Sequence, residues 1–173
     1  MPHYEIHAST PLSSSQRGTF ASRLTALHCI TFTAPSIFVN ITFHNDSTIS
    51  YVGGKRQETH NYIIGHIRPR PASARHKVQE LVTGIMALWD ELVRSEDNKA
   101  SGRLDNEKGL HNVFIMEDIT AGAEQGFLLP IAGQDGSWVE ENMAAFEKRA
   151  EDGDASMQAF LHEIKLGVGK GPL

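Results

Sequence analysis

The hydrophobic and polar positions along the chain predict two strand–helix–strand units in succession. Residues 3–8 alternate between polar and apolar side chains, which is typical of a half-buried strand. Ser13 and Gln16 have the spacing of a capping box and open a predicted helix over 14–31, whose apolar residues recur at helical spacing. Residues 37–43 are rich in β-branched and aromatic side chains and predict the strand that completes the first unit.

The second unit begins near residue 60 and repeats this order. Residues 61–67 predict a strand, and the helix predicted over 73–94 has the broadest apolar stripe in the chain. Residues 111–116 predict the closing strand. The polar stretch 95–109 predicts an insertion loop on the surface, and a minor strand is expected at 48–52 between the two units.

The C-terminal third has a different pattern, in which glycines separate short helices. Ser137 and Glu140 have capping-box spacing and predict the start of a short helix. Asp154 is expected to cap a last helix that runs through Ile164. The final residues, 166–173, are predicted to form a disordered tail.

These elements predict an α/β fold in a single domain over residues 1–165. A strand–helix–strand unit within one sheet makes a right-handed parallel crossover. Two units side by side therefore give a four-stranded mixed sheet with two helices on one face, followed by the short C-terminal helices. The opposite face of the sheet needs a cover, which the C-terminal helices could supply in part and the association of subunits could supply otherwise. We therefore expect a homo-oligomer.

Composition and charge narrow the classes of function. The 173 residues carry a net charge of −5, which argues against a nucleic-acid partner because binding to a phosphate backbone needs a basic surface. No apolar run reaches the roughly 18–20 residues of a membrane span, and the first residues do not have the pattern of a signal peptide. The lone Cys29 cannot form an internal disulfide, so we expect a cytoplasmic protein.

Motifs for metals and cofactors are weak. The nine histidines show no ligand spacing such as His-Glu-x-x-His, so no metal site is predicted. The glycines near the C-terminus lack the spacing of a phosphate-binding loop, so no cofactor is expected.

Pro2 is the first candidate for chemistry. Removal of Met1 would leave Pro2 with a free secondary amine, and an α-amine has a reference pKa near 8 that burial or nearby cations lower further. Such an amine can act as a general base, as a general acid or as a nucleophile. The alternative is that Pro2 only begins a strand.

Arg68 and Arg70 are the next candidates. Each precedes a proline and is therefore biased toward an extended conformation. Residues i and i+2 of an extended chain point the same way, so the two guanidinium groups would project together, about 7 Å apart, and could hold a carboxylate. The alternative is a solvated basic turn, and Arg75 is a reserve candidate for the same role.

The chain resembles the tautomerase superfamily and, within it, the cis-3-chloroacrylic acid dehalogenase-like group. The resemblance runs from Pro2 to about residue 165 and rests on the Met-Pro start, on His28 near the end of the first helix and on the arginines before the second helix. It also rests on the segment Ala-Glu-Gln-Gly-Phe-Leu-Leu-Pro at 123–130 and on the Gly-Ser-Trp at 136–138. The resemblance implies a tautomerase-like fold and a trimer.

The resemblance also implies roles for single residues. Pro2 would be catalytic, Arg68 and Arg70 would hold the substrate carboxylate, and His28 would donate a hydrogen bond to a substrate oxygen. Glu124 would help to activate water. From the residues alone, His28 could equally be a packed or helix-capping histidine, and Glu124 could be a solvated loop carboxylate.

One departure from the group concerns the closing strand, where the group has a tyrosine that assists the addition of water. Val113 and Phe114 occupy the candidate positions here, and neither side chain can donate a hydrogen bond. Phe114 is instead expected to form an apolar wall of the substrate pocket. The departure shifts the expected chemistry toward proton transfer.

The sequence therefore predicts a tautomerase or isomerase that acts on a small 2-oxo or enol carboxylic acid through Pro2 as general base. The alternative chemistry is hydration or hydrolytic dehalogenation of a small unsaturated or halogenated acid, with Pro2 as acid and Glu124 as the water-activating base. A third hypothesis, from another class, is a non-catalytic binding module on the same fold.

Overall fold

The computed structural model describes residues 2–45, 49–94 and 107–167. The elements, in chain order, are β1 His3–Ala8, α1 Ser14–Phe32, the 3-10 turn η1 Ser36–Phe38, β2 Asn40–Asn45, β3 Ser50–Val52, β4 Lys55–Gln57, β5 Asn61–His66, the 3-10 turn η2 Ala72–Ala74, α2 Arg75–Leu92, β6 Leu110–Met116, β7 Ala123–Glu124, β8 Phe127–Leu128, α3 Asp135–Glu151 and α4 Ala155–Lys165. Within these ranges, no helix has both the length and the apolar character needed to cross a membrane.

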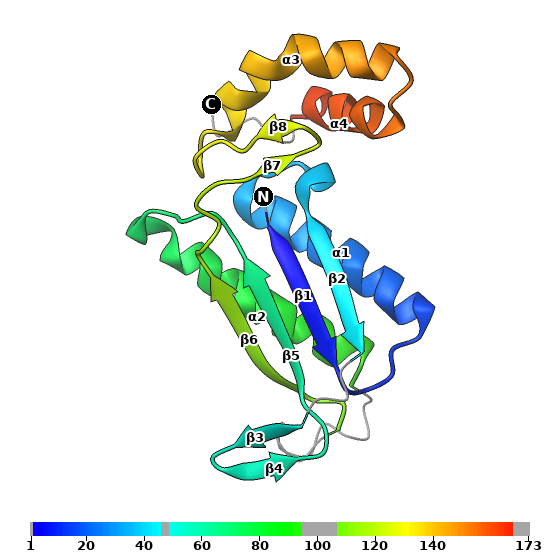
Figure 1. The fold of residues 1–173 in the computed structure, drawn as a ribbon, viewed down its shortest axis with the longest axis vertical. Helices are drawn as coiled ribbons and strands as arrows, with labels where there is room; N and C mark the ends of the chain where they lie inside the picture. The colour runs from blue at the N-terminus through cyan, green and yellow to red at the C-terminus, as the bar shows by residue number, and fades with distance from the viewer. Residues whose placement is uncertain (1, 46–48, 95–106, 168–173) are drawn as a thin grey trace.

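The main sheet has four strands in the order β2-β1-β5-β6 (Figure 1). β1 pairs with β2 in parallel, β5 pairs with β6 in parallel, and the two inner strands β1 and β5 are antiparallel. Helices α1 and α2 lie side by side on one face. This arrangement confirms the predicted mixed sheet of two strand–helix–strand units with two helices on one face.

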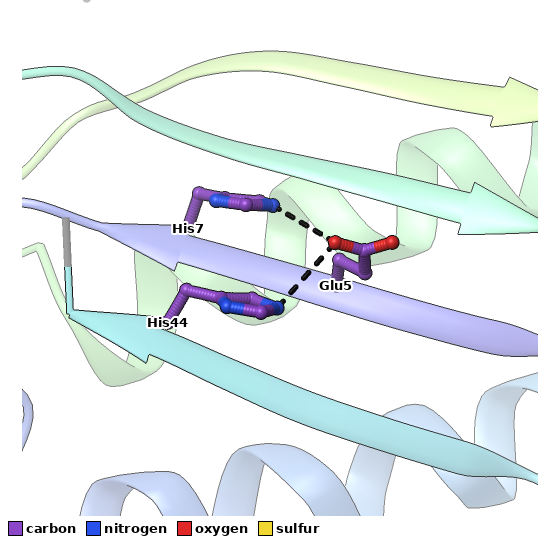
Figure 2. Close-up of side chains that lie close together, drawn as sticks. All are labelled: Glu5, His7 and His44. Atoms are coloured by element: carbon purple, nitrogen blue, oxygen red, sulfur yellow. Dashed lines mark hydrogen bonds and ion pairs between the residues drawn. The ribbon is translucent and has the colours of Figure 1, made fainter. Parts of the chain in front are cut away.

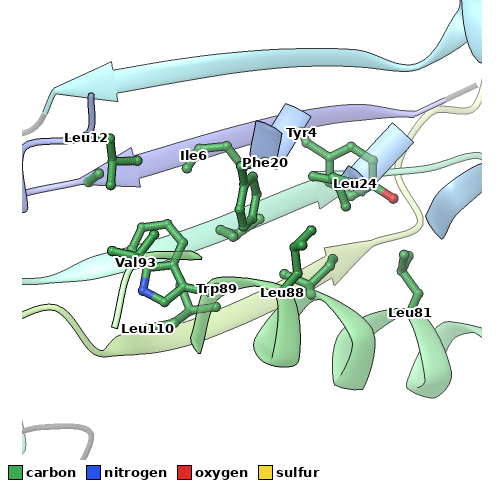
Figure 3. Packing of buried hydrophobic residues seen from close by; sticks show 13 residues of the cluster. Tyr4, Ile6, Leu12, Phe20, Leu24, Leu81, Leu88, Trp89, Val93 and Leu110 are labelled. Carbon is green, nitrogen blue, oxygen red and sulfur yellow. The ribbon is translucent and has the colours of Figure 1, made fainter. Parts of the chain in front are cut away.

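A hydrophobic core fills the space between the sheet and its two helices (Figure 3). Its buried members are Tyr4, Ile6, Ala8, Leu12, Phe20, Leu24, Ile63, Leu81, Ile85, Leu88, Trp89, Val93 and Leu110. Gly65 is required at its position in β5, because a Cβ there would lie 2.8 Å from the Tyr4 ring and 2.7 Å from Ile115. The missing side chain lets the Tyr4 ring lie across the neighbouring strand, at the end of the sheet where the candidate site forms.

Helices α3 and α4 lie beyond one end of the sheet (Figure 1) and contribute to a second hydrophobic cluster. Helices α3 and α4 pack on each other and on η1, and the buried members are Phe38, Trp138, Val139, Phe146, Ala150, Met157, Phe160 and Ile164. The expectation that the C-terminal helices cover part of the open sheet face is therefore wrong, because their apolar faces are used in this cluster. The sheet face opposite α1 and α2 has no cover among the described residues.

The predicted boundaries shift where tertiary contacts intervene. The strand expected at 37–43 begins only at Asn40, because the preceding residues form η1 and bury Phe38 in the second cluster. The minor strand is shorter than predicted and pairs with β4 in a hairpin. The predicted loop 95–109 lies mostly outside the described residues, as does the tail from residue 168 onward.

The three predicted helix caps have different outcomes. Ser13 and Gln16 form the expected capping box, and Asp154 accepts hydrogen bonds from the first backbone N–H groups of α4. The capping box predicted at Ser137 is wrong. Helix α3 begins two residues earlier, at Asp135, and the Ser137 hydroxyl donates to the carbonyl of Gln134 instead.

Candidate functional site

The start of β1 is tied to the loop after β6 through one residue of β2. Pro2 is buried, and its carbonyl accepts a hydrogen bond of 3.1 Å from the backbone N–H of Asn40. The side-chain amide of Asn40 donates to Glu124 Oε1 at 2.8 Å. Pro2 and Glu124, which are more than 100 positions apart in the sequence, are therefore joined by two consecutive hydrogen bonds to Asn40.

Asn40 was not predicted as a site residue. A polar residue at the start of a strand has no distinctive pattern, and its place here follows from the register that pairs it with His3.

Glu124 keeps one carboxylate oxygen available. The Oε2 atom is buried and has no hydrogen-bond partner among the residues that the structure describes. Burial raises the pKa of Glu124, whereas the positive charge of the chain's amino terminus, the Arg68 guanidinium and the Asn40 hydrogen bond act to lower it. The carboxyl group is thus partly dehydrated, lies within electrostatic reach of two cations and can bind a water molecule or a cationic amine.

His28 lies at the end of α1 and is 1% exposed. Its Nδ1 shares a hydrogen bond of 2.8 Å with the Tyr4 hydroxyl. The pKa of His28 is lowered to about 3, chiefly by burial and in addition by charge repulsion from the amino terminus, Arg70 and Arg68. Burial also raises the pKa of Tyr4 above its usual value. At neutral pH both groups are therefore uncharged.

The lowered pKa of His28 is expected to make stability depend on pH. In the unfolded chain His28 has the ordinary histidine pKa of 6.5 and binds a proton more readily than in the folded chain. The contribution of neutral His28 to the free energy of unfolding is therefore fully present above about pH 6.5 and is lost progressively as the pH decreases toward 3. At pH 5 the loss is about 2 kcal/mol by this linkage. Urea denaturation at pH 8 and pH 5 measures it.

The matched variants for this pH effect are His28→Gln and His162→Gln. His28→Gln removes the titrating group and is expected to flatten the pH dependence, whereas His162→Gln changes an exposed histidine of α4 and is expected to retain it. Equal slopes for all three proteins would show that His28 is not buried in its neutral form.

Arg70 is half-buried beside a cavity. Its guanidinium lies over the Phe32 ring, with Cζ 3.7 Å from the ring centroid, and the same ring is 4.8 Å from that of His28. The Arg70 Nε is buried and has no hydrogen-bond partner within the described ranges. Arg70 and Phe32 line a cavity of about 370 Å³ together with Thr33, Pro71, Ser73, Ala74, His76, Lys77, Ala132, Gly133, Asp135 and Gly136. The cavity thus has cationic side chains for an anionic ligand and an aromatic wall.

Arg68 has different surroundings from Arg70. It is 4% exposed, and its two Nη atoms donate at 2.7 Å to the Pro130 carbonyl and to Asp135 Oδ1. Only its Nε remains without a partner in the part of the chain that the structure describes. The guanidinium groups of Arg68 and Arg70 therefore do not form a matched pair with shared partners, because β5 ends at His66 and each arginine contacts a different segment.

Two other candidates lie apart from this group. Phe114 is paired with Ile64 on the open face of the sheet and is 51% exposed. Arg75 is exposed at the start of α2. No described contact joins either residue to Pro2, His28 or Glu124.

Donor atoms that suit a metal ion are sparse where Pro2, His28 and Glu124 lie. The imidazole of His28 already shares a hydrogen bond with Tyr4, and the single carboxylate of Glu124 faces Asn40. A histidine–glutamate cluster does occur elsewhere, on the open face of the sheet, and is formed by Glu5, His7 and His44. The group around Pro2 is therefore better suited to a small carboxylate than to a cation.

Comparison with known proteins gives one family and a set of structural neighbours. A family model described as "Putative oxalocrotonate tautomerase enzyme" matches residues 1–143. No curated protein matches the chain.

Solved structures share the fold at low sequence identity. The crystal structure of N1, a member of the cis-3-chloroacrylic acid dehalogenase family, is 19% identical, covers 87% of this chain and 99% of its own, and has a TM-score of 0.60. A protein from the thermophilic fungus Aspergillus fumigatus is 20% identical, with coverages of 82% and 94% and a TM-score of 0.56. A fused 4-OT asymmetric trimer is 15% identical, with coverages of 73% and 94% and a TM-score of 0.53.

Proposed function

The chain belongs to the tautomerase family whose model it matches over residues 1–143, and from this premise we propose that it is an isomerase of small 2-oxo or enol carboxylic acids that uses Pro2 as general base. The observation that carries the proposal is the convergence of the amino terminus, His28, Arg70 and Glu124 at one end of the sheet. The charge of the amino terminus, which is that of Met1 here and would pass to Pro2 on removal of Met1, acts on both His28 and Glu124, and Arg68 acts on the same two groups. These groups therefore share one electrostatic environment.

The proposed base is the secondary amine that Pro2 acquires when Met1 is removed. Pro2 is buried, and burial lowers the pKa of an amine because it disfavours the charged form. A base with a pKa near the working pH is the most effective in proton transfer. Glu124 can stabilise the ammonium that forms when Pro2 accepts the proton.

The other residues position the substrate in this proposal. Arg70 binds the carboxylate, with Arg68 adding positive charge and its remaining Nε–H, and the cavity beside Arg70 holds the rest of the acid. His28 donates a hydrogen bond from Nε2 to the carbonyl or enol oxygen, provided that Tyr4 donates to Nδ1 and so keeps the proton on Nε2. Pro2 removes a proton from one atom of the acid and returns it to another.

We also propose a cytoplasmic homotrimer. The open face of the sheet has no cover within the described residues of one chain, and association of subunits over the part formed by β6 would cover Phe114. The fused 4-OT neighbour is itself a trimer. The cytoplasmic location rests on Cys29, which needs no oxidising compartment.

A screen of enol acids tests the proposed activity. Protein whose mass shows complete loss of Met1 is mixed with phenylenolpyruvate or a simple 2-hydroxydienoate, and ketonisation is followed by absorbance. The methyl ester of each acid is the matched control, because it removes the charge that Arg70 is proposed to bind. We expect turnover of the acids and little turnover of the esters. Binding of the acids without turnover would favour the non-catalytic binding module.

Addition of water to an unsaturated or halogenated acid is the second candidate activity, and the unpartnered Oε2 of Glu124 favours it. A buried carboxylate oxygen beside the amine can orient a water molecule for attack. Here Pro2 in its protonated form would supply the proton to the substrate.

Glu124→Gln is expected to separate the two activities. The amide keeps the size of the side chain but cannot act as a base, so hydration should fall by about 10²–10⁴-fold, whereas ketonisation should change by less than about tenfold. Both rates are measured by absorbance on the same preparation. A larger loss of ketonisation than of hydration would contradict the role of Glu124 as the water-activating base.

A further inference from the structure

The open face of the sheet carries a cluster of three potential metal ligands, Glu5, His7 and His44 (Figure 2). Glu5 and His7 are two residues apart on β1 and therefore point to the same side of the sheet. The parallel register of β1 and β2 pairs His7 with His44. The sequence showed no ligand spacing because the three groups come from two strands that meet only in the folded chain.

The distances within the cluster approach those of a metal site. His7 Nε2 lies 3.3 Å and His44 Nε2 lies 3.4 Å from the same oxygen, Glu5 Oε2, and all three ligand atoms are within 4.8 Å of one another. A tetrahedral ion with bonds of about 2.0–2.2 Å needs ligand atoms about 3.3–3.5 Å apart. Two of the three separations already have this length.

The third separation can close by small side-chain rotations. The imidazoles of His7 and His44 are stacked with centroids 4.4 Å apart and planes 9° apart, so both Nε2 atoms face the same carboxylate oxygen (Figure 2). All three side chains are partly exposed, which leaves them room to tilt toward a common ion.

The surroundings of Glu5 resemble the outer shell of a metal ligand. The other carboxylate oxygen, Oε1, lies 3.3 Å from His66 Nε2, and His66 Nδ1 is held by Asp118 Oδ2 at 2.8 Å. His7 is in addition stacked on Tyr62, with centroids 4.4 Å apart and planes 3° apart. Polar contacts to the outer side of a ligand orient it and increase its basicity.

We propose that Glu5, His7 and His44 bind a divalent transition-metal ion of the zinc type. Two imidazole nitrogens and one carboxylate suit Zn²⁺, whereas Mg²⁺ and Ca²⁺ prefer sites made only of oxygen atoms. Three protein ligands leave a coordination position for water. The Nε2 atoms of His7 and His44 both face Glu5 Oε2, and because a metal binds only deprotonated imidazole, its affinity falls as the pH is lowered.

Calorimetric titration of the full-length, chelator-treated protein with ZnCl₂ tests the proposal. We expect one ion per chain, with weaker binding at pH 6 than at pH 8. Glu5→Gln and His44→Ala should each weaken binding by more than about 100-fold, and His66→Ala by about 10–100-fold through loss of the outer contact. His162→Ala, which removes an exposed histidine of α4, is the matched control and should bind as the wild type does.

A second probe makes the ligand assignment independent of folding defects. Co²⁺ in the same site should give visible absorption bands of four- or five-coordinate geometry, which Zn²⁺ abolishes and Mg²⁺ does not. Glu5→Gln is nearly isosteric, and His44 lies on an edge strand, so circular dichroism should show both variants folded. Absence of saturable binding, fewer than one ion per chain, or equal affinity in these folded variants and the wild type would overturn the proposal.

Discussion

Insertion of one glycine between Met1 and Pro2 is expected to lower kcat/KM for the enol acid by about 10²–10⁴-fold, the usual contribution of a positioned general base. The insertion turns the Pro2 nitrogen into an amide, which has no basic lone pair at neutral pH. Because the proline ring and every other site residue remain, the loss should appear mainly in kcat. The absorbance assay for ketonisation measures it, and mass spectrometry identifies the first residue.

Pro2→Ala is the companion variant. Alanine also allows removal of Met1 and leaves a primary amine, so some of the base function should remain and the loss should be smaller than that of the insertion. Circular dichroism and thermal denaturation show whether either change disturbs β1, since Pro2 is buried. Folded insertion protein with the wild-type rate would refute the role of the Pro2 amine.

Arg68→Met is expected to reduce the free energy of unfolding by about 3–5 kcal/mol, the usual cost of removing one partner of a buried ion pair. The variant leaves the Asp135 carboxylate and the Pro130 carbonyl without their donors in a dry environment. It also frees the start of α3 from the end of β5. Urea denaturation followed by circular dichroism measures the loss.

Two further variants separate stability from substrate binding. Asp135→Leu added to Arg68→Met removes the unpaired charge and should recover much of the stability. Arg70→Met should cost little stability, because the Arg70 side chain has no ion pair among the described contacts, yet it should lower kcat/KM by about 10–100-fold through loss of a charge-assisted hydrogen bond. Equal destabilisation by Arg68→Met and Arg70→Met would contradict the different roles assigned to the two arginines.

Local sequence signals predicted most of the fold. The alternation over residues 3–8 and the apolar stripe of α2 reflect burial on one side of an element, which a sequence records directly. Ser13 with Gln16 and Asp154 cap helices through contacts within four residues. The capping box predicted at Ser137 was wrong because the start of α3 depends on Asp135, whose partner Arg68 is 67 positions away.

The site could be predicted only as far as the family resemblance indicated it. The contacts that assemble it are non-local: Asn40 links Pro2 to Glu124, and Tyr4 holds His28 across 24 positions. The cluster of Glu5, His7 and His44 depends likewise on strand register. A shift of one residue between β1 and β2 would separate these groups, and no local pattern encodes that register.

The inner position of β1 in the sheet affects when Met1 can be removed during synthesis of the chain. β1 needs both β2 and β5 as neighbours, so it cannot be enclosed before residue 66 has been made, which takes roughly 3–13 s at about 5–20 residues per second. Until then the first residues of the nascent chain stay accessible to the aminopeptidase that would remove Met1. Once the sheet closes, Pro2 is buried, so we expect removal of Met1 to become slower. The fraction of chains that acquire the proposed base therefore depends on the rate of Met1 removal at the ribosome relative to the rate at which the sheet folds.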